Sequence, residues 1–172
     1  MSIKKVGTID FRVYDDHEEF VGIASVTLPD KNQKTITLSG ASIGGDVEIP
    51  VRGHYDAMTL TLAFANFSER VARLREPRLH MLTLRIAQQG EDSVAGKIVV
   101  DADKHVFKCV PKSKTGGEVA PAQARNSNVQ MSVRYWATFF NGRLVDEIDQ
   151  LNRIDVVNGV DYNEPVRRAL GL

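Results

Sequence analysis

The segment whose residue types are best suited to bind a metal ion is Asp101-Ala102-Asp103-Lys104-His105. Alternate residues of a β-strand share one face, so a strand here would present two carboxylates and an imidazole together, and such a set can bind a metal ion. A solvated turn between two short strands explains the same residues equally well. The four histidines show no paired spacing typical of a zinc site. We therefore expect neither a metal nor a cofactor.

Other reactive groups are scattered along the chain. The glycines between residues 39 and 52 lack the Gly-Lys-Ser/Thr ending of a phosphate-binding loop. Cys109 is the single cysteine, which excludes an internal disulfide, and we interpret it as a small buried hydrophobic residue. Asp146 and Asp149 lie close together but have no partner base or nucleophile. The sequence therefore predicts that the protein is not an enzyme.

The composition is that of an ordinary globular protein. The 172 residues contain 22 basic and 22 acidic side chains, so the net charge is zero, and nothing indicates a basic nucleic-acid-binding domain. The two N-terminal lysines are not followed by an apolar run, which argues against a signal peptide. No segment has the roughly 18 apolar residues of a membrane span. We expect one domain over residues 1–172, assembled in cytoplasm and not in a membrane.

Period-two patterns predict that the elements around these residues are mainly strands. Asn141-Gly142 between two of them is a strong hairpin signal. One internal helix is expected over residues 68–75, capped by Ser68 and ended by Pro77. Residues 112–128 are expected to form a flexible loop. The expected strands are 9–14, 20–28, 34–38, 57–64, 79–87, 94–101, 106–110, 129–140 and 144–154.

The end of the chain contains clear sequence signals for a turn and for both ends of a helix. Asn158-Gly159 predicts a turn, and Glu164–Leu170 predicts a short helix with Asn163 as its cap and Gly171 as its stop. A helix of about two turns is not stable alone in water. We therefore expect the C-terminal helix to dock on another part of the structure and clamp the end of the chain.

This C-terminal segment resembles the major tail tube proteins of contractile-tailed phages, the FII-like tube family that includes phage-tail-like bacteriocins (tailocins). The resemblance is carried by Glu147-Ile148-Asp149, by Val157-Asn158-Gly159-Val160-Asp161 and by the terminal Arg167-Arg168-Ala169-Leu170-Gly171-Leu172. Order and spacing also match along most of the chain, from Ser25-Val26-Thr27-Leu28-Pro29 through the glycine-containing loop to the Asn141-Gly142 hairpin. Residues 79–128 match only in pattern.

The resemblance implies a small β-sandwich or half-open barrel with one flanking α-helix and a short C-terminal helix. It implies hexameric rings that stack into a rigid hollow tube, in which each subunit lends two hairpins to a continuous inner β-barrel. The regions 20–38 and 129–154 are the expected contributors. It further implies a virion location in the phage tail and passage of DNA through the lumen without sequence-specific contact. The tube of a DNA-free contractile injection particle is the alternative.

The implied partners are further copies of this chain, the tail sheath protein, the tape measure protein, the baseplate and the tail terminator. Residues 39–52 are too long and too apolar for a free surface loop, so we interpret them as an arm that packs on a neighbouring subunit or ring. A loop folded over its own sandwich is the alternative. The expected contact residues are Ile43, Gly44, Gly45, Asp46, Val47 and Ile49.

Two further surfaces are expected from the same resemblance. A bore rich in lysine or arginine would bind DNA phosphates and slow the passage of DNA, so neutral or acidic side chains suit it better. Asp146 and Asp149 are the lumen candidates. Arg70 and Arg73 lie on the outer face of the predicted helix and are candidates for sheath contact, although a merely solvated face is also consistent with them.

Overall fold

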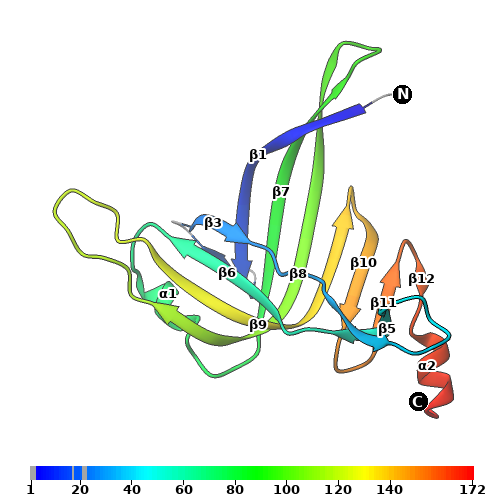
Figure 1. The fold of residues 1–172 in the computed structure, drawn as a ribbon. Coiled ribbons are helices and arrows are strands. Elements are labelled where there is room, and N and C mark those ends of the chain that lie inside the picture. The colour runs from blue at the N-terminus through cyan, green and yellow to red at the C-terminus, as the bar shows by residue number, and fades with distance from the viewer. Residues whose placement is uncertain (1–2, 17, 21–22) are drawn as a thin grey trace.

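A computed structural model describes residues 3–16, 18–20 and 23–172. The chain is mainly β, as predicted, with two short helices, α1 (Glu69–Arg73) and α2 (Glu164–Ala169) (Figure 1). Neither helix in these ranges has the length and apolar character needed to cross a membrane. The strands are β1 (Ile3–Asp15), β2 (Glu18–Phe20), β3 (Ile23–Thr27), β4 (Gln33–Leu38), β5 (Val47–Tyr55), β6 (Met58–Phe64), β7 (His80–Asp92), β8 (Lys97–Thr115), β9 (Ser127–Phe140), β10 (Arg143–Asp149), β11 (Ile154–Val157) and β12 (Val160–Asp161).

Ten of these strands form one sheet that branches at β9. One edge of β9 pairs with β8, whereas the other edge pairs with β6 over its first half and with β10 over its second half. β3 extends the β6 branch. β6 crosses in front of the lower ends of β7 and β8, so the sheet folds over on itself without closing (Figure 1).

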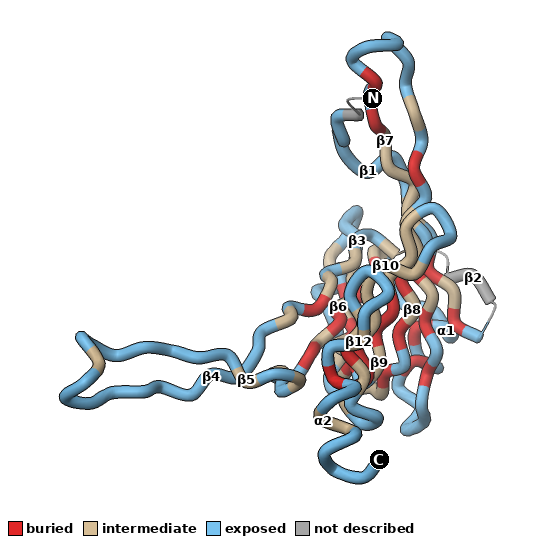
Figure 2. Tube along the Cα trace, turned by 90° about the vertical axis from the view of Figure 1, so that its right-hand side faces the viewer, coloured by how far each residue is buried: buried red, intermediate tan, exposed pale blue. Residues whose placement is uncertain are grey.

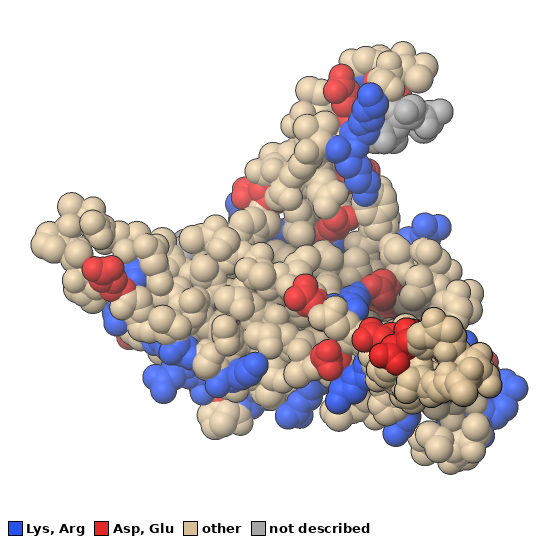
Figure 3. Space-filling model, in the orientation of Figure 1, with Lys and Arg blue, Asp and Glu red and all other residues tan. Residues whose placement is uncertain are grey.

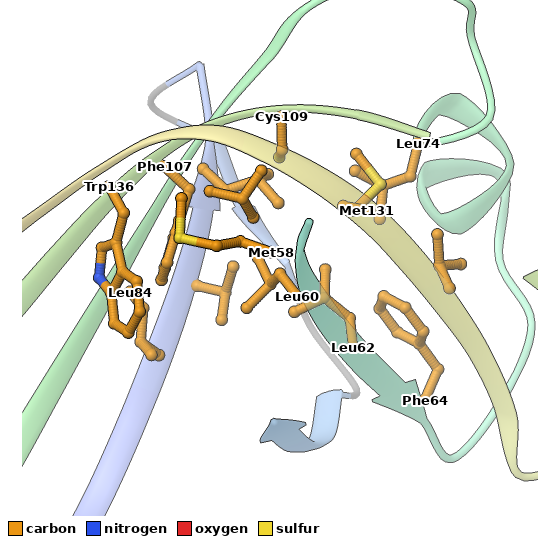
Figure 4. Close-up of a cluster of buried hydrophobic side chains, with 14 of the residues drawn as sticks. Met58, Leu60, Leu62, Phe64, Leu74, Leu84, Phe107, Cys109, Met131 and Trp136 are labelled. Carbon is orange, nitrogen blue, oxygen red and sulfur yellow. The ribbon is translucent and has the colours of Figure 1, made fainter. Parts of the chain in front are cut away.

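The core lies between the two limbs of this folded sheet. Met58, Leu60, Leu62 and Phe64 of β6 are all buried, and the alternation in their sequence is therefore a true inward face. They pack with side chains from β7, β8 and β9, among them Phe107, Cys109 and Met131 (Figure 4). Helix α1 closes one end of the core with Val71 and Leu74.

The helix predictions are confirmed in position but only partly in mechanism. Ser68 Oγ accepts a hydrogen bond from Val71 N at 3.4 Å, so it caps α1 as expected. At the end of α2, Gly171 N donates to Arg168 O and Leu172 N to Arg167 O, which is a Schellman arrangement with Gly171 at φ +74. The predicted capping role of Asn163 is wrong, because its side chain makes no capping hydrogen bond and is buried.

Both predicted Asn-Gly turns are confirmed. Asn141 and Gly142 have φ of +47 and +81, and Asn158 and Gly159 have +50 and +85, so each pair adopts the doubly positive φ of a type I′ turn. The first turn joins β9 to β10 and the second joins β11 to β12.

Several strand boundaries differ from expectation. The single strand predicted over 144–154 is two strands, because Asp149 Oδ1 accepts hydrogen bonds from Leu151 N and Asn152 N and turns the chain. β8 runs unbroken through 101–105 and on to Thr115, so neither a turn at 101–105 nor a loop starting at 112 is present. The region 20–38 does not form a hairpin, since β2 pairs with β1, β3 with β6 and β4 with β5; residues 21–22 lie outside the described residues.

Candidate functional site

One pair of strands stands apart from the sheet. β4, β5 and the turn between them (residues 33–55, hereafter the arm) project from the body as a two-stranded ribbon (Figure 2). All of β4 and most of β5 are exposed. Residues 39–52 therefore project from the body together with β4 (Figure 2), and their packing on a neighbouring subunit or ring remains a prediction.

The arm has one apolar and one polar face. Ile36 lies opposite Ile49, and Leu38 lies opposite Val47, so all four side chains share one face of the ribbon. Each is between 43% and 56% exposed, which is high for large apolar side chains arranged in one row. Thr37 and Glu48 lie opposite each other on the other face. We call the row of Ile36, Leu38, Val47 and Ile49 the apolar face of the arm.

The structure places the predicted contact residues in two groups. Ile43, Gly44, Gly45 and Asp46 form the turn at the tip, where Ile43 N donates to Gly40 O at 3.0 Å and Ile43 is half-buried. Val47 and Ile49 belong to the apolar face. Sequence reasoning missed Ile36 and Leu38, which were assigned to a strand but not to a contact. If residues 34–38 had been paired with residues 47–51 across the glycine-rich turn, Ile36 and Leu38 would have been placed on the same face as Ile49 and Val47.

The base of the arm is held by side chains from the C-terminal part of the chain. Tyr55 Oη donates to Asp155 Oδ2 at 2.7 Å, and Lys31, just before β4, forms an ion pair with Asp146. The Lys31 Nζ also lies 4.0 Å from the centre of the Trp136 ring. A cation over an aromatic face and beside a carboxylate is a favourable arrangement in a partly buried site.

The two lumen candidates are both engaged within the subunit. Asp146 shares the core-facing side of the sheet with Ile148 and Trp136 and pairs with Lys31. Asp149 is 8% exposed and holds the turn after β10 through both carboxylate oxygens. The two residues are three positions apart on one strand, so they point to opposite faces and cannot line one surface together. A lumen role for either remains a prediction.

The sheath candidates Arg70 and Arg73 lie on the exposed side of α1, opposite the buried Val71. Both take part in interactions with other residues of the subunit. Figure 3 shows that lysine and arginine side chains gather along the lower margin of this view, beneath β8 and β9. A sheath contact at α1 remains a prediction.

A buried set of Asp15, His80 and Cys109 contains the residue types of a catalytic triad but not its geometry. His80 Nδ1 lies 3.4 Å from Asp15 Oδ2, yet Nε2 is 3.2 Å from Glu76 O and not near the thiol. The Cys109 Sγ lies 3.8 Å from the backbone O of His80. Burial raises the pKa of the Cys109 thiol to about 12, so it stays protonated and packs as an apolar group.

The candidate metal ligands in residues 101–105 each form hydrogen bonds with different partners. Asp101 accepts a hydrogen bond from Asn141 Nδ2 at 3.0 Å, and Asp103 accepts one from Gln88. His105 is buried, and its Nδ1 accepts from Trp136 Nε1 at 3.2 Å. Among residues 3–16, 18–20 and 23–172, no three His, Cys, Asp or Glu side chains lie close enough together to hold a metal ion. Burial lowers the pKa of His105, which favours the neutral ring.

Three comparisons with known proteins agree with this architecture. Residues 8–171 match the family described as Phage tail tube protein FII. The tail tube protein of Escherichia phage P2 is 27% identical over 156 residues, which cover 89% of this chain and 90% of that protein.

Two solved structures of an extracellular contractile injection system, PVC, share the fold. A chain of its sheath/tube terminator in the extended state matches with a TM-score of 0.56 and 14% identity, over 78% of this chain and 96% of that one. A chain of its sheath-tube complex in the extended state matches with a TM-score of 0.53 and 14% identity, over 75% and 87% of the two chains.

Proposed function

The chain belongs to the phage tail tube protein FII family, and on this premise we propose that six copies close into a ring and that the rings stack into the hollow inner tube of a contractile tail. The role is structural, in the tail of a virion or of a related injection particle. The relatives are tube proteins and not enzymes, and we infer no catalytic activity for this chain.

The apolar face of the arm is the observation that carries this proposal. A two-stranded ribbon is marginally stable on its own in water, and this one exposes a row of four large apolar side chains. Contiguous exposed apolar surface marks an interaction site. A second copy of the chain supplies the missing cover. Because the arm and the surface that receives it differ, the contact is heterologous and can close into a ring or extend into a stack.

The dimensions of such an assembly suit a DNA conduit. If each of six subunits lends four strands spaced about 4.8 Å apart and tilted near 40°, the barrel backbone is about 48 Å across. Side chains reduce the bore to about 40 Å, which admits a duplex. Adjacent subunits are then about 24 Å apart along the wall, and the nine residues of β5 span about 30 Å, enough to reach a neighbour.

The strands of the inner barrel are assigned from adjacency in the sheet. The hairpins β7–β8 and β9–β10 lie edge to edge, because β8 pairs with β9, and together they offer four antiparallel strands. We propose the β7–β8 hairpin in place of the region 20–38, and we retain the hairpin expected within residues 129–154 as β9–β10. We also retain one domain for the whole chain, since the core draws residues from Val13 to Ile148.

The proposed partners follow from the tube role. Two structural relatives come from a sheath-tube complex and from a sheath/tube terminator, and we propose a sheath and a terminator for this chain as well. A baseplate, a tape measure protein and DNA that passes through the lumen without specific contact complete the proposal. The second candidate is the tube of a DNA-free injection particle, which the fold shared with the PVC chains supports.

Negative-stain microscopy of the concentrated protein tests the assembly. We expect rings or tubes from the natural chain and monomers of unchanged fold after deletion of residues 42–45 from the arm tip. Deletion of residues 120–123 from the loop 116–126 is the matched control and should leave tubes intact. Normal tubes from the arm-tip deletion would contradict the proposed role of the arm.

A further inference from the structure

The arm is attached to the body at few points, and the main ones come from one stretch of sequence. Tyr55 of β5 bonds to Asp155 of β11 at 2.7 Å, and Gly53 of β5 lies directly against the Asn163 side chain. Asp155 and Asn163 both belong to the unit formed by β11, β12 and α2 (residues 154–169, hereafter the C-terminal unit). This unit therefore contacts Gly53 and Tyr55 at the base of the arm (hereafter the root).

We propose that the C-terminal unit is a bracket that sets the direction of the arm, so that Asp155 and Asn163 act as positioning residues for assembly. The proposal rests on the proposed function in one respect, namely that the arm engages a neighbouring copy. The bracket itself is a property of the single subunit and can be measured there.

The contact between Gly53 and Asn163 requires glycine for two reasons. Gly53 has φ of +71, a left-handed conformation that other residues adopt only at a cost. A Cβ built on Gly53 would also lie 2.4 Å from Asn163 Nδ2 and 2.7 Å from its Cγ, so any side chain at this position must displace that of Asn163. Asn163 is only 3% exposed although it makes no capping bond, and we assign its burial to this packing against the arm.

A chain of polar contacts connects helix α2 to the arm through the C-terminal unit. Arg167 Nη2 donates to Asp161 Oδ2 at 2.6 Å, and Asp161 Oδ1 accepts from Asp155 N at 3.4 Å. Asp155 in turn accepts from Tyr55. The short helix, which is not stable alone, is thereby part of the structure that orients β5.

The contact ends at the root. Beyond Tyr55, a groove of about 290 Å³ separates the arm from the C-terminal unit, lined by Pro50 and Arg52 on one side and Val157 and Tyr162 on the other. The rest of the ribbon is exposed. The direction of the whole arm therefore depends on the few contacts at its root, chiefly those that Gly53 and Tyr55 make with the C-terminal unit.

A small change at the root has a large effect at the tip. A rotation of about 10° at one end of a 30 Å ribbon moves the other end by about 5 Å. Apolar side chains are in contact only within about 4.5 Å, so that displacement is enough to lose an interface at the tip. Assembly should therefore respond to substitutions at the root that never touch the neighbouring copy.

The test measures arm direction in the monomer and assembly separately. Spin labels are placed at Ser42→Cys on the arm tip and Lys108→Cys on the body; the natural Cys109 is fully buried and should remain unlabelled. We expect one narrow distance distribution in the parent, a broad or shifted one in Gly53→Ala, and a smaller change in Tyr55→Phe, which removes only the hydroxyl. The concentration needed for tube formation should rise at least tenfold in Gly53→Ala.

Gly96→Ala is the matched control. Gly96 also has positive φ, +61, but no atom lies within 4 Å of the point that a Cβ would occupy, so the substitution carries the same backbone penalty without the contact. It should leave the distance distribution of the monomer unchanged. Unchanged distributions in both Gly53→Ala and Tyr55→Phe would overturn the bracket. A broadened distribution with normal tube formation would overturn instead the role of the arm in assembly, and with it the proposed function.

Discussion

Strand β6 and the arm carry the same sequence pattern and have opposite environments. Only two residues separate β5 from β6, and both elements alternate large apolar with polar or small residues. The large apolar side chains of β6 are at most 1% exposed, whereas the four on the apolar face of the arm are at least 43% exposed. Periodicity therefore identifies a strand and its apolar face, but it does not say whether the cover comes from the same chain or from another copy.

The largest expected difference between the two regions is in the stability of the monomer. Leu62→Ala removes a fully buried side chain and should lower the free energy of unfolding by about 3 kcal/mol. Ile49→Ala should cost less than about 0.5 kcal/mol, because nearly half of that residue is already exposed to water in the monomer. Urea unfolding at concentrations where the chain is monomeric, followed by Trp136 fluorescence, measures both. Equal losses would mean that the arm packs on its own body.

Subunit association, in contrast to monomer stability, should depend more on the apolar face of the arm than on the core. Ile49→Asp puts a charge on the apolar face of the arm, and we expect subunit association to weaken at least tenfold, or about 1.4 kcal/mol, with an unchanged unfolding midpoint. Thr35→Asp is the control, since Thr35 lies on the opposite face of the same ribbon. Sedimentation velocity across a concentration series compares them. A similar loss in both variants would show that charge on the arm, and not its apolar face, governs association.

Two turn glycines, one in the body and one in the arm, should differ in their effect on stability. Gly142, at φ +81, joins the body strands β9 and β10, and Gly45, at φ +144, lies at the arm tip; a Cβ added at either would have no atom within 4 Å. Gly142→Ala should destabilise the fold by about 1–2 kcal/mol through backbone strain alone. Gly45→Ala should leave the thermal midpoint unchanged, because the arm is not part of the cooperative core. Thermal unfolding by circular dichroism distinguishes the two; a lowered midpoint in Gly45→Ala would place the arm within the folding unit.

These contrasts also explain how much of the structure the sequence could predict. Features that depend on a few neighbouring residues were predicted well. The Asn-Gly turns need positive φ at only two adjacent residues, and the Ser68 cap joins two residues three positions apart. The turn after Asp149 was missed because an aspartate can cap a turn or continue a strand, and only its hydrogen bonds decide. β5 was missed as a strand because Pro50 interrupts its pattern, which an edge strand tolerates.

The candidate site was harder to predict than the fold. The glycine-rich segment was recognised as an arm, but its apolar face depends on pairing between Ile36 and Ile49, which only the register reveals. Asn163 was assigned to a helix cap from its position, whereas its side chain packs on Gly53, more than a hundred residues earlier. A contact of that sequence separation leaves no signal in a single sequence.

The smallest predicted effect concerns pH and acts on the core alone. Burial lowers the pKa of His105 below its ordinary value of 6.5, so the folded state favours the neutral ring whose Nδ1 accepts from Trp136. A lowered folded pKa means that the unfolded chain binds more protons in this range, so stability is complete above pH 6.5 and falls as the pH drops below it. Asp103 opposes this shift and Lys31 reinforces it. The raised pKa of buried Asp15 acts with the opposite sign, since its contribution is complete below 3.8 and is lost as the pH rises.

The difference between the parent and His105→Gln, which cannot be protonated, isolates the histidine from these other groups. We expect the thermal midpoint of the parent to fall faster than that of His105→Gln between about pH 6.5 and 5, because only the parent must exclude a proton from the folded core. His54→Gln, at the exposed base of the arm, is the control and should behave like the parent. Parallel curves for parent and His105→Gln would mean that the ring is protonated in the folded core without penalty.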